Sequence, residues 1–141
     1  MSDQNFKNHT RLVKPFHFVA YPIMVAVLVC AIVNLCRCNE NCLEAWMILG
    51  LTIALIIIAW YTRVFALTAQ DRAIRAEENF RHFILTGKPF DKRLRTGQVI
   101  ALRFAPDEEF VQLTGRAVAE NMKPKEIKAA IVNWKGDHHR V

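Results

Sequence analysis

Two long apolar runs dominate the pattern of hydrophobic and polar positions along the chain. Residues 16–35 and residues 45–62 contain no Asp, Glu, Lys or Arg, which makes runs of 20 and 18 residues. As a helix, at about 1.5 Å per residue, each run is long enough to cross a bilayer core of about 30 Å. We therefore predict transmembrane helices over residues 16–36 and 45–67, joined by a short loop over residues 37–44.

A cleaved signal peptide is the alternative for the first run, because a basic segment precedes it. The run is longer than the usual apolar region of about 7 to 15 residues in such peptides. The residues that follow, Leu35-Cys36-Arg37-Cys38, also lack a small-residue cleavage site. We therefore expect the first helix to be retained.

Aromatic and basic residues mark the ends of the second span, as they commonly do at membrane interfaces. The expected interface anchors are Trp46, Trp60, Tyr61 and Arg63. Gly50 and Ala54 form a small-xxx-small pair, which predicts a face for packing against another helix.

The remainder of the chain shows helical periodicity and no strand alternation. No Pro or Gly follows Arg63 until Gly87, so we expect the second span to continue into a first tail helix with its apolar positions at Ala73, Ala76, Phe80, Phe83 and Ile84. Gly87 and Pro89 then end that helix. Three shorter helices are predicted: from Asp91 to about Phe104, from Pro106 onward, and from Pro124 to Trp134. The expected fold is all-α: a transmembrane hairpin, then a cytosolic bundle of short helices over residues 68–141.

The charge distribution predicts the orientation of this hairpin. The net charge is +2 over residues 1–18, −1 over residues 36–44, +1 at Arg63 and +4 over residues 70–141, which adds up to +6. Because short cytoplasmic flanks collect Lys and Arg, both termini, including the basic segment 1–15, are expected in the cytoplasm and the loop outside. The expected location is the bacterial inner (cytoplasmic) membrane.

Three of the four cysteines, Cys36, Cys38 and Cys42, lie within the predicted loop or directly before it. In an oxidising compartment they favour a disulfide, with Cys36 or Cys38 joined to Cys42, although free thiols remain an alternative. Crosslinking between chains and metal or redox chemistry are further alternatives. A metal site would need a fourth ligand, and no His stands nearby.

Catalytic motifs are missing from the sequence. There is no P-loop, G-x-G-x-x-G, H-E-x-x-H or nucleophile elbow, and Ser2 is the sole serine. We expect neither an enzyme nor a bound cofactor. The basic run Lys88, Lys92, Arg93 and Arg95 is interpreted as a set of contacts to anionic lipid headgroups, in preference to nucleic acid.

Several segments carry a family resemblance: residues 5–10, 70–81, 100–104 and 125–128, with Asn133 and Trp134. Together they resemble a bacterial family of small two-span membrane proteins of unknown function. The resemblance supports the two-span topology and implies no activity, cofactor or catalytic residue.

The leading functional hypothesis is a non-enzymatic scaffold or accessory subunit, whose helical tail docks another membrane protein or a second copy of the chain. A redox or metal sensor of the cell envelope, acting through the loop cysteines, is the alternative. A membrane-tethered nucleic-acid binder is a weaker alternative.

Overall fold

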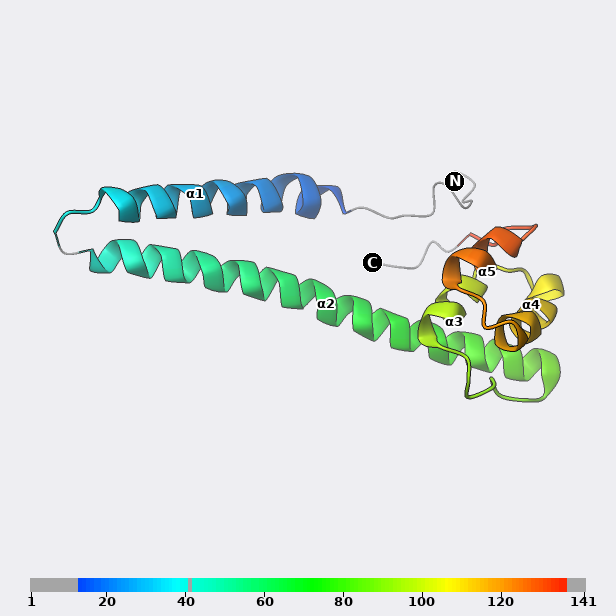
Figure 1. The fold of residues 1–141 in the computed structure, drawn as a ribbon. Coiled ribbons are helices and arrows are strands. Elements are labelled where there is room, and N and C mark those ends of the chain that lie inside the picture. Colours follow the sequence, from blue (N-terminus) through cyan, green and yellow to red (C-terminus); the bar gives the residue numbers. More distant parts are fainter. Residues whose placement is uncertain (1–12, 41, 137–141) are drawn as a thin grey trace. The chain divides into compact units, whose positions relative to one another are not determined.

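The chain is all-helical over the residues that the computed structural model describes, 13–40 and 42–136, and these contain no strand. This confirms the all-α prediction. After one π-helical turn, η1 (Phe16–Ala20), the helices are α1 (Tyr21–Arg37), α2 (Leu43–Thr86), α3 (Thr96–Leu102), α4 (Asp107–Ala119) and α5 (Pro124–Ala130) (Figure 1). Most of the predicted segment 1–15 lies outside the described residues.

The wide turn η1 has a local cause in Pro22. Proline has no backbone N–H, so the hydrogen-bond ladder of the helix is interrupted where Pro22 would donate. The N–H of Tyr21 bonds instead to the carbonyl oxygen of Phe16, five residues back. From Tyr21 onward the helix is regular to Arg37.

Helix α2 is unbroken from Leu43 to Thr86, and the absence of Pro and Gly between Arg63 and Gly87 predicts its continuation beyond the apolar run. It ends where Gly87 takes a positive φ of 71°, and the N–H of Gly87 bonds to the carbonyl oxygen of Phe83. This left-handed conformation suits glycine and satisfies a terminal carbonyl of the helix.

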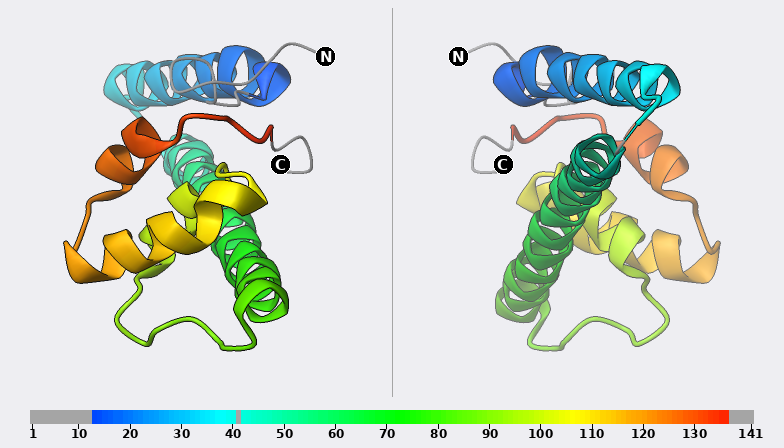
Figure 2. Two further views of the ribbon diagram at one scale, coloured as in Figure 1. Left: turned by 90° about the vertical axis from the view of Figure 1, so that its right-hand side faces the viewer. Right: turned by 90° about the vertical axis from the view of Figure 1, so that its left-hand side faces the viewer.

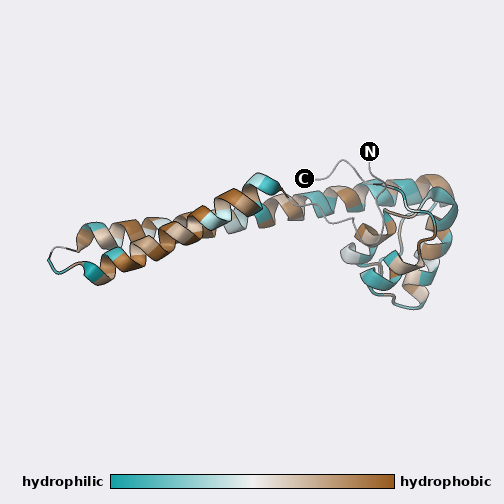
Figure 3. Cartoon of the chain, turned by 90° about the horizontal axis from the view of Figure 1, so that it is seen from above, coloured by the Kyte–Doolittle hydropathy of each residue, from teal (hydrophilic) through white to brown (hydrophobic). Residues whose placement is uncertain are grey.

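Two helices of the described chain are long and apolar enough to cross a membrane. The segment Phe16–Arg37 has a mean hydropathy of 2.4 in its most apolar window, and that of α2 is 2.1. Only 6% and 11% of these windows are buried within the protein. Figure 3 shows the resulting apolar character of α1 and of the first part of α2.

The chain forms two compact units, which divide at Ala66 and Leu67 within α2. We call residues 13–66 the span unit and residues 67–136 the tail domain. In the tail domain, the connection 87–95 leaves the end of α2 and loops back to α3 (Figure 2).

The tail domain has its own hydrophobic core. Its largest fully buried side chains are Leu94, Val99, Leu102, Phe104, Phe110 and Ile127. Helices α3, α4 and α5 surround this cluster, and Phe90 and Trp134 pack against its edge. One buried polar residue, Gln98, joins two of the helices: its amide nitrogen donates to the carbonyl oxygen of Met122 at 2.9 Å, just beyond α4. The buried amide is thus hydrogen-bonded, as burial of a polar group requires.

Two predicted helix boundaries are wrong. Asp91 does not begin a helix, because its carboxylate accepts the N–H of Arg93 at 2.9 Å and forms a turn instead. Helix α3 begins at Thr96, with the side chain of Gln98 accepting the N–H of Arg95.

The last helix, α5, ends at Ala130 rather than at Trp134. Ile131 has an extended backbone, and the next two N–H groups, of Val132 and Asn133, donate to the carboxylate of Glu109 at 2.9 Å each. These bonds to α4 replace the helical bonds that would have continued α5. Trp134 therefore lies outside the helix, half-buried against the ring of Phe104 at 5.0 Å.

Candidate docking surface

The last five turns of α2 present a polar face to the core of the tail domain. The side chains on this face include Arg75, Glu78, Asn79, Arg81 and His82, with Ile74 as the buried apolar member. This is the reverse of an ordinary amphipathic helix, which turns its apolar stripe toward the core.

Arg81 is the centre of this polar contact, and its side chain is only 14% exposed. Its Nε donates to Asp107 Oδ1 at 2.6 Å, Nη1 to Glu78 Oε2 at 3.0 Å, and Nη2 to the carbonyl oxygen of Ala105 at 2.9 Å. The guanidinium also lies over the ring of Phe110, 4.2 Å from its centroid. Arg81 thus joins α2 to the start of α4 through Asp107, Ala105 and Phe110, while Glu78 on α2 pairs with the same guanidinium.

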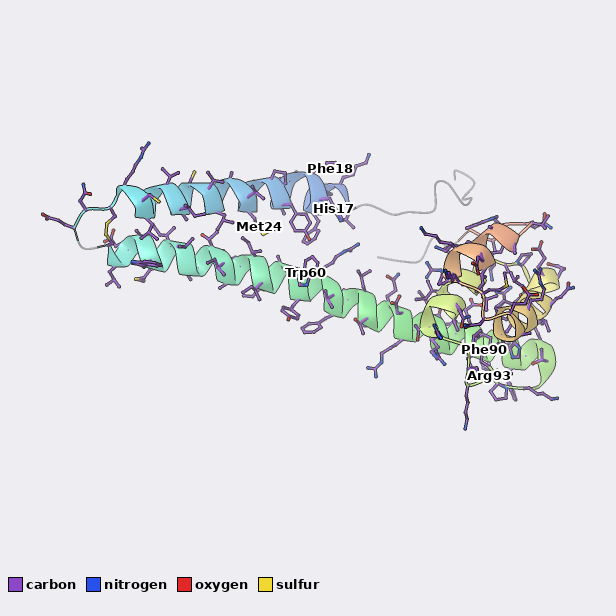
Figure 4. The ribbon with its side chains drawn as sticks, in the orientation of Figure 1. His17, Phe18, Met24, Trp60, Phe90 and Arg93 are labelled. Carbon is purple, nitrogen blue, oxygen red and sulfur yellow. A yellow bond between two sulfur atoms is a disulfide. The ribbon has the colours of Figure 1, made fainter. Side chains whose placement is uncertain are left out.

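Three further side chains of α2 contact the rest of the tail domain. Arg75 donates to Thr96 at the start of α3 at 3.1 Å, and Asn79 Oδ1 accepts the N–H of Phe90 at 2.8 Å. The ring of His82 lies 4.9 Å from that of Phe90. Figure 4 shows Phe90 and Arg93 in the connection between α2 and α3. These contacts fix which face of α2 is covered.

The opposite face of α2 is apolar and open. Phe80 is 65% exposed, Phe83 50% and Ile84 66%. The predicted apolar positions Ala73 and Ala76 are exposed as well. Their helical spacing was recognised in the sequence, but the structure turns them away from the core, because the polar residues occupy the covered side.

Glu109 holds the C-terminal segment against α4. Its carboxylate accepts the N–H groups of Val132 and Asn133 and the side-chain amide of Asn133 at 3.0 Å. The backbone hydrogen bond from Val132 is the main cause that lowers the pKa of Glu109 below its ordinary value, and the bonds from Asn133 add to it. Hydrogen bonds to a carboxylate favour its charged form.

The predicted basic run lies on the surface of the connection 87–95. Lys88, Lys92, Arg93 and Arg95 are all exposed. Arg93 is engaged with Asp91, whose side-chain hydrogen bonds with Arg93 lower the pKa of Asp91 to about 2. One of the four cations, Arg93, is therefore already paired with a carboxylate of the same connection.

Of the three cysteines at the turn between α1 and α2, two form a disulfide and one, in the last turn of α1, is a free thiol. Cys38 and Cys42 are joined, with their Cα atoms 5.7 Å apart, and this bond closes the connection between α1 and α2. Cys36 is free and exposed, as is Cys30 within α1. Among the described residues, no group of three His, Cys, Asp or Glu side chains could hold a metal ion.

The expected interface anchors and the expected packing face lie on α2. Trp46, Trp60 and Tyr61 are exposed and Arg63 is half-buried. Figure 4 labels Trp60 on α2. Gly50 and Ala54 are both exposed. In the span unit the small residues that are buried are Ala31, Ala45 and Thr52, and Thr52 Oγ1 donates to the carbonyl oxygen of Ile48 at 2.8 Å.

Sequence reasoning missed Arg81, Glu109 and Gln98. Arg81 pairs with Glu78 three residues back and with Asp107 far along the chain. The one available signal was that the apolar stripe of this helix is sparse, with Ala at two of its positions. Glu109 and Gln98 act through distant backbone groups, for which a single sequence carries no signal.

These features define an all-helical protein with two helices that could cross a membrane and a tail domain with an uncovered apolar helix face. A model of the family of unknown function DUF6526 matches residues 1–141, so the chain belongs to this family. No curated protein and no solved structure matches the chain.

Proposed function

We propose that this protein is an integral protein of the bacterial inner membrane, non-enzymatic, and that its tail domain docks another membrane protein or a second copy of the chain. In this proposal α1 and the first part of α2 form a transmembrane hairpin. Both termini and the tail domain lie in the cytoplasm, and the loop that follows α1 lies outside, with Cys36 in the last turn of α1 beside it.

The exposed apolar surface of the two long helices supports the membrane assignment. A helix in the core of a soluble protein is mostly buried, whereas the apolar windows here are almost entirely exposed. Such a surface is stable in contact with lipid and costly in water. The disulfide Cys38–Cys42 agrees with a loop in an oxidising compartment.

The single observation that carries the docking role is the open face of α2 in the tail domain. Phe80, Phe83 and Ile84 are adjacent large apolar side chains on this face. Monomeric soluble proteins rarely expose large apolar patches, and such patches mark interaction sites. These three side chains do not contribute to the core of the tail domain, because that core packs against the other side of the helix.

The test has two stages. Carbonate extraction of membranes should leave the protein in the pellet; release into the supernatant contradicts the membrane assignment. In a mild-detergent pull-down with mass spectrometry, Phe80→Glu/Phe83→Glu should then lose the proteins, or the second copy, that the wild type retains.

Val111→Glu is the matched control for this variant. Val111 is an apolar residue of α4 that is 39% exposed and lies off the open face of α2. The Val111→Glu variant should bind the same set of proteins as the wild type. Equal binding by Phe80→Glu/Phe83→Glu and the wild type would show that α2 is not the docking face.

A further inference from the structure

The open face of α2 has the spacing of a coiled-coil seam. Its members within the tail domain are Ala69, Ala73, Ala76, Phe80 and Phe83, and all five are exposed. They follow one another at intervals of four, three, four and three residues, the alternation of a and d positions in a heptad. At about 100° per residue they occupy an arc of about 80° on the helix.

Most of the residues that contact the tail core lie on the other side of the same helix. In this heptad register Ile74 and Arg81 take position b, Arg75 and His82 position c, and Glu78 position f. These positions point away from an a/d seam, and Asn79, which accepts the N–H of Phe90, takes position g at the edge of the seam. The tail core therefore covers α2 without blocking the seam, and a second helix can reach it.

The charges beside the seam match a parallel copy of the same helix. Arg72 takes position g and Glu77 takes position e of the following heptad, and both are exposed. Neither side chain makes a hydrogen bond or ion pair with another described residue. In a parallel in-register pair, position g of one helix faces position e, five residues later, on the other. Arg72 of each copy then faces Glu77 of the other, which gives two opposite-charge pairs.

We infer that α2 of the tail domain pairs with α2 of a second copy as a parallel, in-register coiled coil along Ala69, Ala73, Ala76, Phe80 and Phe83. This inference rests on the proposed function and deepens it by naming the partner. Two copies inserted in one membrane with the same topology can present α2 only in parallel, which agrees with the charge pattern. Small Ala side chains allow close approach of the helices, and confinement to one membrane raises the effective concentration of the second copy.

The first test measures the mass of the full chain in mild detergent by light scattering. The wild type should be a dimer and Ala73→Glu a monomer, because two carboxylates would meet in the seam. Ala129→Glu is the matched control, since Ala129 is an exposed alanine of α5 off the seam, and it should remain a dimer. A monomeric wild type, or a dimeric Ala73→Glu, would overturn the inference.

The second test uses charge reversal and also checks that the variants are folded. Arg72→Glu and Glu77→Arg should each shift the monomer–dimer equilibrium toward monomer by about tenfold or more, and the double variant should restore the wild-type equilibrium. A folding defect would not be repaired by the second reversal. If the double variant is no better than the single ones, the parallel register is wrong.

Crosslinking in the native membrane completes the test, in a background with Cys30→Ala and Cys36→Ala. Ala73→Cys should form a disulfide-linked dimer on mild oxidation, and Ala129→Cys should not. If the protein resists carbonate extraction and Phe80→Glu/Phe83→Glu loses another protein while the wild type is monomeric, the proposed docking function stands and only the second-copy inference fails.

Discussion

The guanidinium of Arg81 lies over the ring of Phe110, 4.2 Å from its centroid, while its nitrogen atoms bond to three groups around that ring. A cation over an aromatic face gains from the ring quadrupole, and more so when both groups are shielded from water. Phe110 is fully buried and belongs to α4. This contact therefore anchors the end of the long helix to the core of the tail domain.

Replacing Arg81 by Ala should destabilise the tail domain by about 3 to 5 kcal/mol, because Glu78 would be left nearly buried without its cation. Asp107→Asn should cost about 1 kcal/mol or less, because Asp107 is 61% exposed and screened by water. Hydrogen exchange of residues 105–112 in the full chain in detergent measures both effects. Equal protection in Arg81→Ala and wild type would contradict the anchoring role.

The bonds of Glu109 make the attachment of the C-terminal segment depend on pH. The folded-state pKa of Glu109 is lowered, so its charged form stabilises the fold above the unfolded pKa of about 4.3. This contribution is lost as the pH falls through the lower folded-state pKa. Relative to their intrinsic rate at each pH, the amide hydrogens of residues 131–135 should therefore exchange faster as the pH is lowered below about 4.3. Glu109→Gln should raise their exchange at neutral pH and flatten this dependence.

Trp134→Ala should loosen the C-terminal segment while leaving membrane insertion intact. The ring packs on Phe104, and the N–H of the next residue, Lys135, bonds to the carbonyl oxygen of Phe104 at 2.8 Å. Truncating a buried aromatic costs about 3 to 5 kcal/mol, and half-burial places Trp134 at or below the lower end of that range. Limited proteolysis should show faster cleavage after Lys123 or Lys128. Unchanged digestion would mean that the indole adds little to the domain.

Two glycines should respond to alanine in opposite directions. Gly87→Ala places a Cβ at a φ of +71° and should destabilise the end of α2 by about 1 kcal/mol. Gly115 lies within α4, and a Cβ added there would meet no atom within 4 Å, so Gly115→Ala should stabilise α4 by about 0.5 to 1 kcal/mol. Thermal unfolding of the detergent-purified variants measures both changes in stability.

The loop cysteines report the orientation of the chain. In spheroplasts without reductant, a membrane-impermeant maleimide should modify Cys36, which is free and exposed, and not Cys38 or Cys42, which are joined. After reduction, Cys38 and Cys42 should become reactive as well. Labelling that requires permeabilised membranes would reverse the proposed orientation.

The sequence alone was sufficient to predict those features of the helices that depend on neighbouring residues. The apolar runs, the unbroken course of α2 and its end at Gly87 follow from residue type and spacing, because helix continuation and termination depend on neighbouring residues. The start of α4 after Pro106 is local in the same sense.

Tertiary contacts decided the boundaries and the orientation of the tail helices. The end of α5 depends on Glu109, which lies 23 residues before Val132. The face that α2 turns to the core depends on Arg81, Asp107 and Phe110, which meet only in the folded domain. The sequence determined that α2 has an apolar stripe, through the helical spacing of Phe80 and Phe83. Which side of α2 is covered was decided by the tertiary structure, because a nearly buried cation needs its hydrogen-bond partners, and these come from distant segments of the chain.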